Sequence, residues 1–516
     1  MEHVSSSSFF MQVNSIIDKL KHAATLPLLM LTAIVSSFLI GCSDMDDDYS
    51  TDPNSRLSFS VDTLRFDTVF TTVGSTTLEF KVYNPNKETL KISSVMLANP
   101  GLSNFRINVD GRKGNSFQDV MIWPQDSMSV FVEVTVDPDD NSLPFIVIDS
   151  VVFLVNGNMQ TVLLEAYGQN AHILRGDIFR RDTTLLADMP YLVYDSIIID
   201  TDATVTIEKG AVFYMHNRAN WIVRGTIKAN GDAENPITIR GDRMDDIVVS
   251  LPYDNAPGQW GGMTFAATSY NNVFDHVIIK NSTGGITCAE STANQTKLSI
   301  RNSQITNAGS TNTGGSILTA FNCIIDASNT EFSNASDAVL LLVGGKYRFT
   351  HCTMANYIRL IRRNDVACVN LSNNYTKDNT LYILPLLEAQ FDNCIIDGNH
   401  DASSLEGESY EGEINLIENK NGEFNYLFNH CQIKTKGENN DHFINVIFEE
   451  SPEYVNSLGD KENNYSFDFR PVESSSGNGK ADAAIAAQYP TDRLGVSRTE
   501  HPDIGAYQHV PDEEGD

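Results

Sequence analysis

Two short phrases in the second half of the sequence are almost the same. Residues 321–326 read FNCIID, residues 391–397 read FDNCIID, and looser copies surround them. When the copies are aligned on the cysteine position, here called the slot, the residue before it is always Asn or His and the residue two after it is always Ile or Met. The copies span residues 274–279, 300–305, 320–325, 349–354, 391–396 and 428–433. A repeat of this kind limits the possible folds strongly.

The repeat predicts a parallel β-solenoid over residues 171–509. Short β-forming runs there are separated by tight turns, without helical periodicity. In a solenoid, equivalent positions of successive coils lie about 4.8 Å apart, so like apolar side chains stack inside. Asn tolerates a left-handed bend and can pass amide hydrogen bonds from coil to coil, and Cys is small enough to follow the bend. The slots lie about 20 to 42 residues apart, which predicts loops of different lengths at the other corners.

These phrases resemble the right-handed parallel β-helix family, which includes many pectin-acting enzymes and many surface proteins without catalytic activity. The resemblance implies an all-β protein whose residues 171–509 wind as a right-handed solenoid. The run Asp503–Tyr507, DIGAY, resembles the closing segment of surface β-helix proteins. It implies a cap over the last open coil, followed by an acidic tail at residues 510–516.

Residues 57–169 follow a different pattern. Short runs such as LEFKVY and MSVFVEV alternate apolar and polar residues and are separated by turn-rich clusters. Such spacing predicts an antiparallel β-sandwich. The segment lacks a Cys–Trp–Cys framework and resembles the immunoglobulin-like modules that precede bacterial surface domains. A rigid spacer is the expected role, and ligand binding by its loops is the alternative.

The start of the chain predicts a lipoprotein. The apolar run Leu26–Ile40 has the length of a signal-peptide core and is short for a membrane span. It ends at Gly-Cys42, which resembles a lipobox and implies that residues 1–42 hold the signal and that Cys42 carries the acyl chains, palmitate included. The acidic tether at residues 43–56 begins SDMDDDYS and resembles the export signal of surface lipoproteins. We therefore expect an outer-membrane protein facing the cell exterior. The alternatives are a cleaved signal with a chance cysteine and a merely solvated tether.

Charge limits the partners. The chain has 36 basic and 67 acidic residues, a formal net charge of −31. Such a surface repels phosphate backbones, so no nucleic-acid partner is expected. The expected partners are the membrane, through the lipid, and a polysaccharide, and the protein is expected to be a monomer.

Catalytic and metal signals are weak. Asp242, Asp245 and Asp246 form the acidic set best suited to Ca²⁺, the one cofactor considered, and a solvated acidic loop is the alternative. The carboxylate motifs of galacturonan hydrolases are missing, so no catalytic residue is assigned. His351-Cys352 and His430-Cys431 occupy repeat positions, and neighbours in a strand point to opposite faces, which favours stacking over a catalytic pair.

Two groups of residues are candidates for ligand binding. Trp260 and Tyr253 could stack on a sugar, although a core role for Trp260 is the alternative. Arg359, Arg362 and Arg363 could clamp an anionic glycan, or pair with surface carboxylates.

The remaining cysteines form no CxxC pair and are expected to be free buried thiols, because parallel stacking would strain a disulfide.

The sequence favours a non-catalytic surface binding or scaffold protein, with polysaccharide as the expected ligand. A polysaccharide lyase or glycoside hydrolase with an unrecognised site stays open, as does an adhesin or structural stalk. Carboxylates from different coils in one groove would favour the enzyme. Exposed aromatic side chains in a row would favour glycan binding, and a smooth polar wall would favour the stalk.

Overall fold

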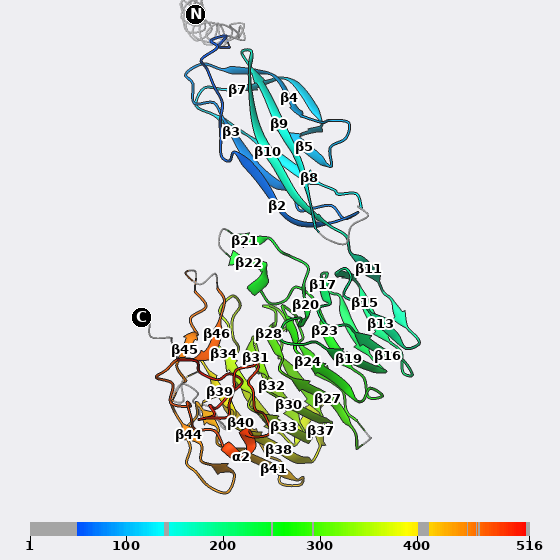
Figure 1. Cartoon of the computed structure of the whole chain (residues 1–516), viewed down its shortest axis with the longest axis vertical. Coiled ribbons are helices and arrows are strands. Elements are labelled where there is room, and N and C mark those ends of the chain that lie inside the picture. Colours follow the sequence, from blue (N-terminus) through cyan, green and yellow to red (C-terminus); the bar gives the residue numbers. More distant parts are fainter. Residues whose placement is uncertain are drawn as a thin grey trace, which may run out of the picture. The chain divides into compact units, whose positions relative to one another are not determined.

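The computed structural model describes residues 49–138, 144–248, 251–291, 294–400, 412–450, 452–460, 462 and 465–511. The predicted leader with Cys42, the start of the tether and the end of the acidic tail lie outside these ranges. The chain divides into two compact units, one built mainly from residues before Ala166 and the other mainly from residues after it. Within the described ranges the elements are strands, apart from the short helix α2 (Ala483–Ala486) and the 3-10 turn η1 (Tyr253–Asn255) (Figure 1).

Two five-stranded sheets form the first unit. One has the strand order β1 (Ser58–Phe59), β3 (Leu78–Tyr83), β8 (Ser127–Val134), β5 (Phe105–Val109), β6 (Arg112–Gly114). The other has the order β2 (Thr63–Phe70), β10 (Asn158–Gln169), β9 (Phe145–Val155), β4 (Leu90–Leu97), β7 (Ser116–Ile122). β3 pairs antiparallel with β1 and β8, and β4 pairs antiparallel with β7 and β9.

Aromatic rings join the two sheets. Phe80 of β3 contacts Phe153 of β9 with ring centroids 6.3 Å apart, and Phe66 of β2 contacts Phe105 of β5 at 5.9 Å. The alternating strands therefore bury one face of each sheet against the other, as the sequence pattern predicts. The likeness to immunoglobulin-like modules remains a prediction.

The second unit contains three long sheets, here called walls 1, 2 and 3. Wall 1 has eleven strands: β11 (His172–Arg175), β14 (Tyr191–Tyr194), β17 (Val212–Met215), β20 (Ile237–Gly241), β25 (Val277–Lys280), β28 (Gln304–Ala308), β31 (Glu331–Ala335), β34 (Thr353–Asn356), β39 (Ile395–Gly398), β42 (Gln432–Ile433) and β44 (Ile447–Phe448). Wall 2 has nine strands: β12 (Ile178–Phe179), β15 (Ser196–Ile199), β18 (Asn220–Val223), β23 (Gly262–Phe265), β26 (Ile286–Cys288), β29 (Leu318–Phe321), β32 (Leu340–Val343), β35 (Val369–Ser372) and β40 (Ile414–Ile417).

Wall 3 has ten strands: β13 (Thr183–Leu185), β16 (Thr204–Ile207), β19 (Thr226–Asn230), β24 (Asn272–Asp275), β27 (Thr296–Arg301), β30 (Ile324–Ser328), β33 (Gly345–Thr350), β38 (Leu386–Asp392), β41 (Phe424–Asn429) and β43 (Phe443–Ile444). Three two-stranded pairs complete the unit: β21 (Asp246–Val248) with β22 (Leu251–Pro252), β36 (Asn374–Lys377) with β37 (Thr380–Ile383), and β45 (Tyr454–Asn456) with β46 (Asp468–Pro471).

Each coil visits the walls in one order. β11, β12 and β13 belong to walls 1, 2 and 3, and β14, β15 and β16 repeat that order one coil later. Neighbouring strands within a wall run parallel, as in β11 with β14, β12 with β15 and β13 with β16. A nearly all-β chain with long parallel sheets is consistent with a parallel β-helix, as the repeat predicts. The right-handed winding remains a prediction.

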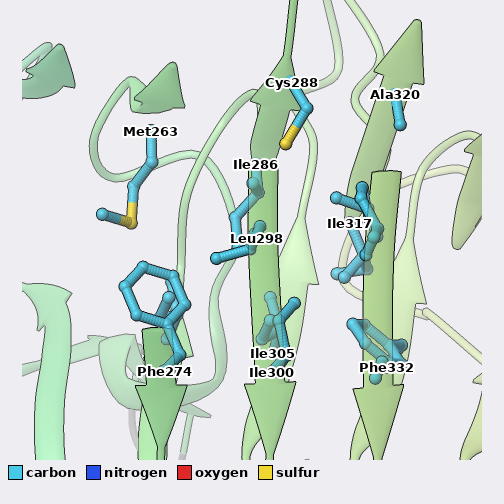
Figure 2. Close-up of a cluster of buried hydrophobic side chains, with 14 of the residues drawn as sticks. Met263, Phe274, Ile286, Cys288, Leu298, Ile300, Ile305, Ile317, Ala320 and Phe332 are labelled. Atoms are coloured by element: carbon cyan, nitrogen blue, oxygen red, sulfur yellow. The ribbon is translucent and has the colours of Figure 1, made fainter. Parts of the chain in front are cut away.

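Inward-pointing side chains from all three walls meet in one buried cluster (Figure 2). Met263 comes from wall 2, Phe274 from wall 3 and Phe332 from wall 1. Like residues also stack along the walls, and the residues three before the slot show this best. The ring centroids lie 5.0 Å apart for Phe349–Phe391, 4.7 Å for Phe391–Phe428 and 5.1 Å for Phe428–Phe443. These spacings match the distance between neighbouring strands, as the repeat predicts.

The predicted bend lies at the corner between wall 3 and wall 1. The residue before the slot has a left-handed backbone, with φ between 48° and 54° at His276, Asn302, His351, Asn393 and His430. Side-chain hydrogen bonds pass between coils there, because Asn393 Nδ2 lies 3.0 Å from His351 Nε2. The bend and the ladder of polar side chains are therefore confirmed.

One of the six aligned copies is wrong. Cys323 precedes β30 in wall 3 and lies at the corner between walls 2 and 3, whereas Cys352, Cys394 and Cys431 precede strands of wall 1. The true slot of that coil is Thr330, which precedes β31. The alignment failed because this coil turns through a left-handed asparagine at both corners. Asn322 has φ 38° and Asn329 has φ 46°, so Asn occupies both bends.

The slot also has a polar role that the sequence analysis missed. Ser303 Oγ accepts a hydrogen bond from Val277 N at 3.0 Å and donates to the carbonyl two residues before it at 2.6 Å. Cys394 Sγ does the same with Cys352 N at 3.5 Å and with its own upstream carbonyl at 3.3 Å. Ser, Thr and Cys therefore recur at the slot because each can accept from one coil and donate within its own.

A second asparagine ladder borders the far end of wall 1. Its members are buried and each lies five residues after the first ladder's residue: Asn281, Asn307, Asn334 and Asn356. Asn356 Oδ1 accepts from Ala335 N at 3.1 Å, and its Nδ2 donates to Asp337 O at 3.0 Å. The spacing of Asn or His to Asn was visible in the sequence and would have predicted both ends of the strand.

The C-terminal segment lies along wall 1. Ala506 N donates to Thr353 Oγ1 of β34 at 3.0 Å, and Arg493 Nη2 donates to Gln304 Oε1 of β28 at 3.3 Å. The buried Arg498 donates to Gly505 O at 3.0 Å and holds the segment together. These contacts run across several coils on the outer face of wall 1. The prediction that Asp503–Tyr507 closes the open end of the solenoid is therefore not confirmed.

Candidate functional site

The two predicted aromatic residues lie in different surroundings. Trp260 is 1% exposed in the core, and its Nε1 donates to Lys280 O at 2.8 Å. Its ring therefore takes the core role and offers no face to a sugar. Tyr253 lies in η1, is half-buried, and has the Arg243 guanidinium 4.1 Å from its ring centre.

The predicted arginine cluster does not share a face. Residues 357–368 form a loop between β34 and β35, so the strand alternation expected for them is missing. Arg359 and Arg362 are exposed, whereas Arg363 is buried. Arg363 forms a two-pronged ion pair with Glu413, Nη1–Oε1 2.9 Å and Nη2–Oε2 2.5 Å. Arg363 therefore has a structural partner, and only Arg359 and Arg362 stay candidates for an anionic ligand.

The ion pair fills a gap in the second asparagine ladder. Gly398 stands where the earlier coils have Asn, and a Cβ there would lie 2.2 Å from Glu413 Oε1 and 2.8 Å from Arg363 Nη1. Glycine is needed because the buried carboxylate occupies that space. Glu413 also accepts from the backbone of Cys368 at 3.0 Å and of His400 at 2.9 Å. A buried charge with this many donors stabilises the coil locally.

Asp397 adds a second carboxyl in the same region, from the same coil as Glu413. Burial raises its pKa to about 6, and the hydrogen bond from the Tyr357 hydroxyl at 2.6 Å lowers it in part. Carboxylates from different coils would favour an enzyme if they faced a groove. Asp397 and Glu413 instead belong to one coil and are fully buried, and Tyr357 packs against Tyr454. Their placement therefore indicates a structural role.

The predicted calcium ligands bind protein groups. Asp242 Oδ2 lies 2.5 Å from His216 Nδ1, and Asp245 accepts from Arg243 Nε at 2.6 Å. Asp246 begins β21. Across the described ranges, no three His, Cys, Asp or Glu side chains are placed to hold a metal ion.

The cysteines within the described ranges are free and buried, as predicted. His351 beside Cys352 is also buried, and burial together with the Arg498 charge lowers the pKa of its imidazole. Its partners are Arg498 and Asn393 rather than its neighbouring thiol. These contacts support the repeat interpretation of the His-Cys pairs.

A hairpin that the sequence did not lead us to predict carries an aromatic cluster with one exposed ring. Strands β36 and β37 pair antiparallel around Asp378 and Asn379, whose φ values of 48° and 59° suit a two-residue hairpin turn. Tyr375 lies opposite Tyr382, and their rings stack with centroids 5.0 Å apart at 12°. Phe321 meets Tyr375 edge-on at 5.6 Å. We call Phe321, Tyr375 and Tyr382 the aromatic platform.

Solvent reaches both faces of this hairpin. Tyr382 is 42% exposed on the platform side, and Leu381 is 52% exposed on the opposite side. A two-stranded ribbon is marginally stable alone, so cross-strand aromatic pairing helps to hold it. Exposed apolar groups gathered in one place mark interaction surfaces more often than single exposed residues do.

Two glycines let the hairpin return to the solenoid. Gly344 and Gly345 have φ 61° and 86°, and a Cβ on Gly344 would lie 2.6 Å from Leu384 Cβ. Only glycine allows the chain to approach so closely in this conformation. The hairpin is therefore fixed at the corner between walls 2 and 3.

A small cavity of about 160 Å³ lies at the same corner. Its lining includes Asn294, Asn322, Lys346 and Leu387. Asn322 follows the platform residue Phe321 directly and donates to Glu290 Oε1 at 2.9 Å. No platform residue lines the cavity, but its amide and ammonium groups lie at the corner that carries the aromatic platform. Amide and ammonium groups can bind the hydroxyls of a sugar, and aromatic rings can bind its C–H face.

The signal for this site was present in the sequence NYTKDNTLYI, residues 374–383. An Asp-Asn pair between two alternating runs is a hairpin signal. The repeat marks the other corner, and its spacing alone predicts only a loop of variable length for the insertion between coils.

Comparisons with known proteins give little. No protein-family model matches the chain, and no curated protein matches it. Among solved structures 22 chains match, including PapD-like domain 7 of human CEP192, with 10% identity, a TM-score of 0.16, and coverage of 25% of this chain and 95% of that one. Another is a family 123 glycoside hydrolase from Clostridium perfringens, with 10% identity, a TM-score of 0.16, and coverage of 23% of this chain and 30% of that one. Scores this low support no argument about fold or function.

In the described part of the chain, no helix has the length and apolarity needed to cross a membrane.

Proposed function

We propose that the protein is a non-catalytic glycan-binding protein of the cell surface. The observation that carries the proposal is the stacked Tyr375–Tyr382 pair, with Tyr382 exposed, on a hairpin at the same corner as a small polar cavity. Sugar rings pack their C–H faces on aromatic side chains, and their hydroxyls need nearby amide or charged partners. Exposed aromatic side chains distinguish a glycan-binding protein from a structural stalk, whose wall would be smooth and polar.

The cellular setting belongs to the same proposal. Cys42 would carry the acyl chains, and the acidic tether would direct the protein to the exterior of the outer membrane. The alternating first unit would act as an immunoglobulin-like spacer, and the walls would wind as a right-handed β-helix. A long solenoid suits an extended ligand, because equivalent positions recur along it.

The main experiment uses the chain without residues 1–42 on a panel of neutral and acidic polysaccharides. Retention in affinity gels and the release of new reducing or unsaturated ends are measured together. Retention without new ends supports binding without catalysis. Tyr382→Ala should weaken retention about tenfold or more, since aromatic anchors dominate binding energy.

Tyr167→Ala is the matched control, because Tyr167 is also partly exposed but lies in β10. Equal losses in both variants, or no retention of any glycan, would contradict the proposal. New chain ends would instead establish an enzyme.

The anchor is tested separately by metabolic labelling with a palmitate analogue. Labelling should disappear in Cys42→Ala, and labelling that persists would refute the anchor.

A further inference from the structure

One end of the first unit, here called the tether end, is where residues 49–56 meet three turns between strands. The turns span residues 84–89, 123–126 and 156–157. Ser50 N donates to Thr89 O at 2.9 Å, and Asn156 Nδ2 donates to Asp52 O at 2.9 Å. These bonds fix the chain that follows the predicted anchor against two of the turns. The glycan-binding proposal does not use this end.

Exposed aromatic side chains gather at the tether end. Tyr49 belongs to its first segment, Tyr83 ends β3 just before the first turn, and Trp123 is 53% exposed in the second turn. Asn84 Nδ2 joins these turns by donating to Trp123 O at 3.1 Å. Tyrosine and tryptophan combine an apolar ring with one polar group, and they are enriched where membrane lipid meets water.

Two exposed aliphatic side chains lie beside the third turn. The two residues of this turn have a left-handed backbone, as a tight hairpin requires, so Leu154 of β9 lies next to Met159 of β10. Phe153 is buried between the sheets, so Leu154 and Met159 point to the outer face, where Met159 is 70% exposed. Apolar side chains gathered in one place indicate an interaction surface.

The tether end is nearly neutral. Its four segments contain Arg56 and Lys87 against Asp52, Glu88 and Asp126, so two basic residues stand against three acidic ones. The chain as a whole has a net charge of −31. An apolar, nearly neutral surface can leave water for a lipid interface at a lower desolvation cost than an acidic surface can.

The predicted anchor lies within reach of this surface. Cys42 precedes Tyr49 by seven residues. An extended chain spans at most about 3.5 Å per residue, so Cys42 lies no more than about 25 Å from Tyr49. Asp44 and residues 46–48, all aspartates, fall between them. These carboxylates repel anionic lipid headgroups, so a zwitterionic lipid surface is the complementary partner.

We infer that the tether end rests on a zwitterionic lipid surface, with Tyr49, Trp123 and Met159 in the headgroup region. The inference rests on the proposed anchor at Cys42. A short tether makes the contact intramolecular, at an effective concentration of about a millimolar, so a weak surface affinity is enough. A few buried apolar side chains can supply that affinity. The contact holds the first unit against the membrane, instead of leaving it free to rotate on the lipid.

The chain without residues 1–42, coupled through its N-terminus to a lipid in phosphatidylcholine vesicles, tests the inference. The coupling supplies an anchor whether or not Cys42 is acylated. Trp221 and Trp260, the other two tryptophans, are buried, so phosphatidylcholine with brominated acyl chains should quench the fluorescence of Trp123. Trp123→Phe should abolish this quenching. Met159→Glu should lower the docked fraction about tenfold or more, because a carboxylate is costly to place in lipid.

Leu102→Glu is the matched control, because Leu102 is 89% exposed but follows β4, whereas residues 84–89 of the tether end precede that strand. It should leave the docked fraction within about twofold. Circular dichroism confirms folding of each variant. The inference is overturned by absence of quenching, by equal losses in Met159→Glu and Leu102→Glu, or by stronger quenching when phosphatidylglycerol is added. Quenching without palmitate labelling at Cys42 would refute the natural anchor alone, and labelling without quenching would refute the lipid contact alone.

Discussion

Two corners of the solenoid differ in how regular they are: the corner between walls 3 and 1, and the corner between walls 2 and 3. At the corner between walls 3 and 1, the coils from β24 onward turn through one left-handed Asn or His, which the slot residue follows. The polar side chains there are bonded from coil to coil. At the corner between walls 2 and 3, the connection ranges from the single residue Gly344 to the whole β36–β37 hairpin.

The difference shows where the fold tolerates change. A corner whose side chains are hydrogen-bonded to the next coil must keep its length, because an inserted residue would shift the stack beneath it. The other corner can accept an insertion, since the flanking strands still pair with their neighbours. The first corner therefore holds the coils together, and the second is free to carry a binding surface.

The largest expected loss of stability comes from a substitution next to the corner between walls 3 and 1, here called the regular corner. Phe391→Ala removes the middle of the stacked phenylalanines next to the regular corner, where the side chain is fully buried. Loss of such a ring lowers the free energy of unfolding by about 3–5 kcal/mol. Chemical denaturation followed by circular dichroism measures it.

Tyr382→Ala on the hairpin is the comparison for this variant. It should lower the free energy of unfolding by less than about 1 kcal/mol, because Tyr382 is 42% exposed and lies on a hairpin outside the three walls. If Phe391→Ala and Tyr382→Ala lowered the free energy of unfolding by similar amounts, the two corners would contribute equally to stability. That result would contradict our interpretation.

The second effect concerns pH and the strand that the regular corner begins. Burial raises the pKa of Asp397, at the far end of β39, to about 6. In the unfolded chain the carboxyl titrates near pH 4, so between about pH 4 and 6 the folded state holds a proton that the unfolded state has lost. Stability from this group is therefore full below about pH 4 and falls as pH rises, by about 3 kcal/mol in all.

Asp397→Asn should remove this loss, since the amide can still accept from the Tyr357 hydroxyl. The free energies of unfolding of the two proteins are compared at several values between pH 4 and 7. Their difference should change by about 3 kcal/mol across that range. A constant difference would show that Asp397 titrates normally in the folded protein.

The third prediction separates two contributions of Asn393 to stability: its left-handed backbone and its side-chain hydrogen bonds. Asn393 combines φ 54° with side-chain bonds to His351 Nε2 at 3.0 Å and from Asp482 N at 2.7 Å. Asn393→Ala loses these bonds and strains the backbone, at about 2–3 kcal/mol, whereas Asn393→Gly loses only the bonds, at about 1 kcal/mol. Thermal and chemical unfolding of both variants provide the test. Equal losses would mean that the backbone conformation contributes nothing.

Much of the fold could be predicted from the sequence because it is periodic. Phe349, Phe391 and Phe428 occupy equivalent positions of successive coils. Aligning the repeated phrases in the sequence therefore predicts that their rings stack on one another. The same logic failed at Cys323, since Asn322 and Asn329 bend the chain at two corners of one coil and the letters alone do not say which corner is meant.

The candidate site was harder to predict because it interrupts the period. Tyr375 and Tyr382 come together through a local hairpin, and Phe321 joins them from an earlier coil. The Arg363–Glu413 pair likewise joins residues 50 apart in sequence, at a place where Gly398 breaks the asparagine ladder. Contacts between an insertion and a coil leave no repeated signal, and turn chemistry alone gives only the hairpin.

The smallest expected effect gives the sharpest comparison of the two corners. Asn322 bends the chain between walls 2 and 3 with φ 38°, but its amide only donates to Glu290 at a partly exposed position. Asn322→Gly should therefore change the free energy of unfolding by no more than about 0.5 kcal/mol, because glycine accepts the bend and an exposed bond contributes little. Asn393→Gly should cost at least twice as much, since its lost bonds join one coil to the next and hold the C-terminal segment. Measured side by side, equal costs would place a bonded ladder at both corners, and the freedom to insert a hairpin would then need another explanation.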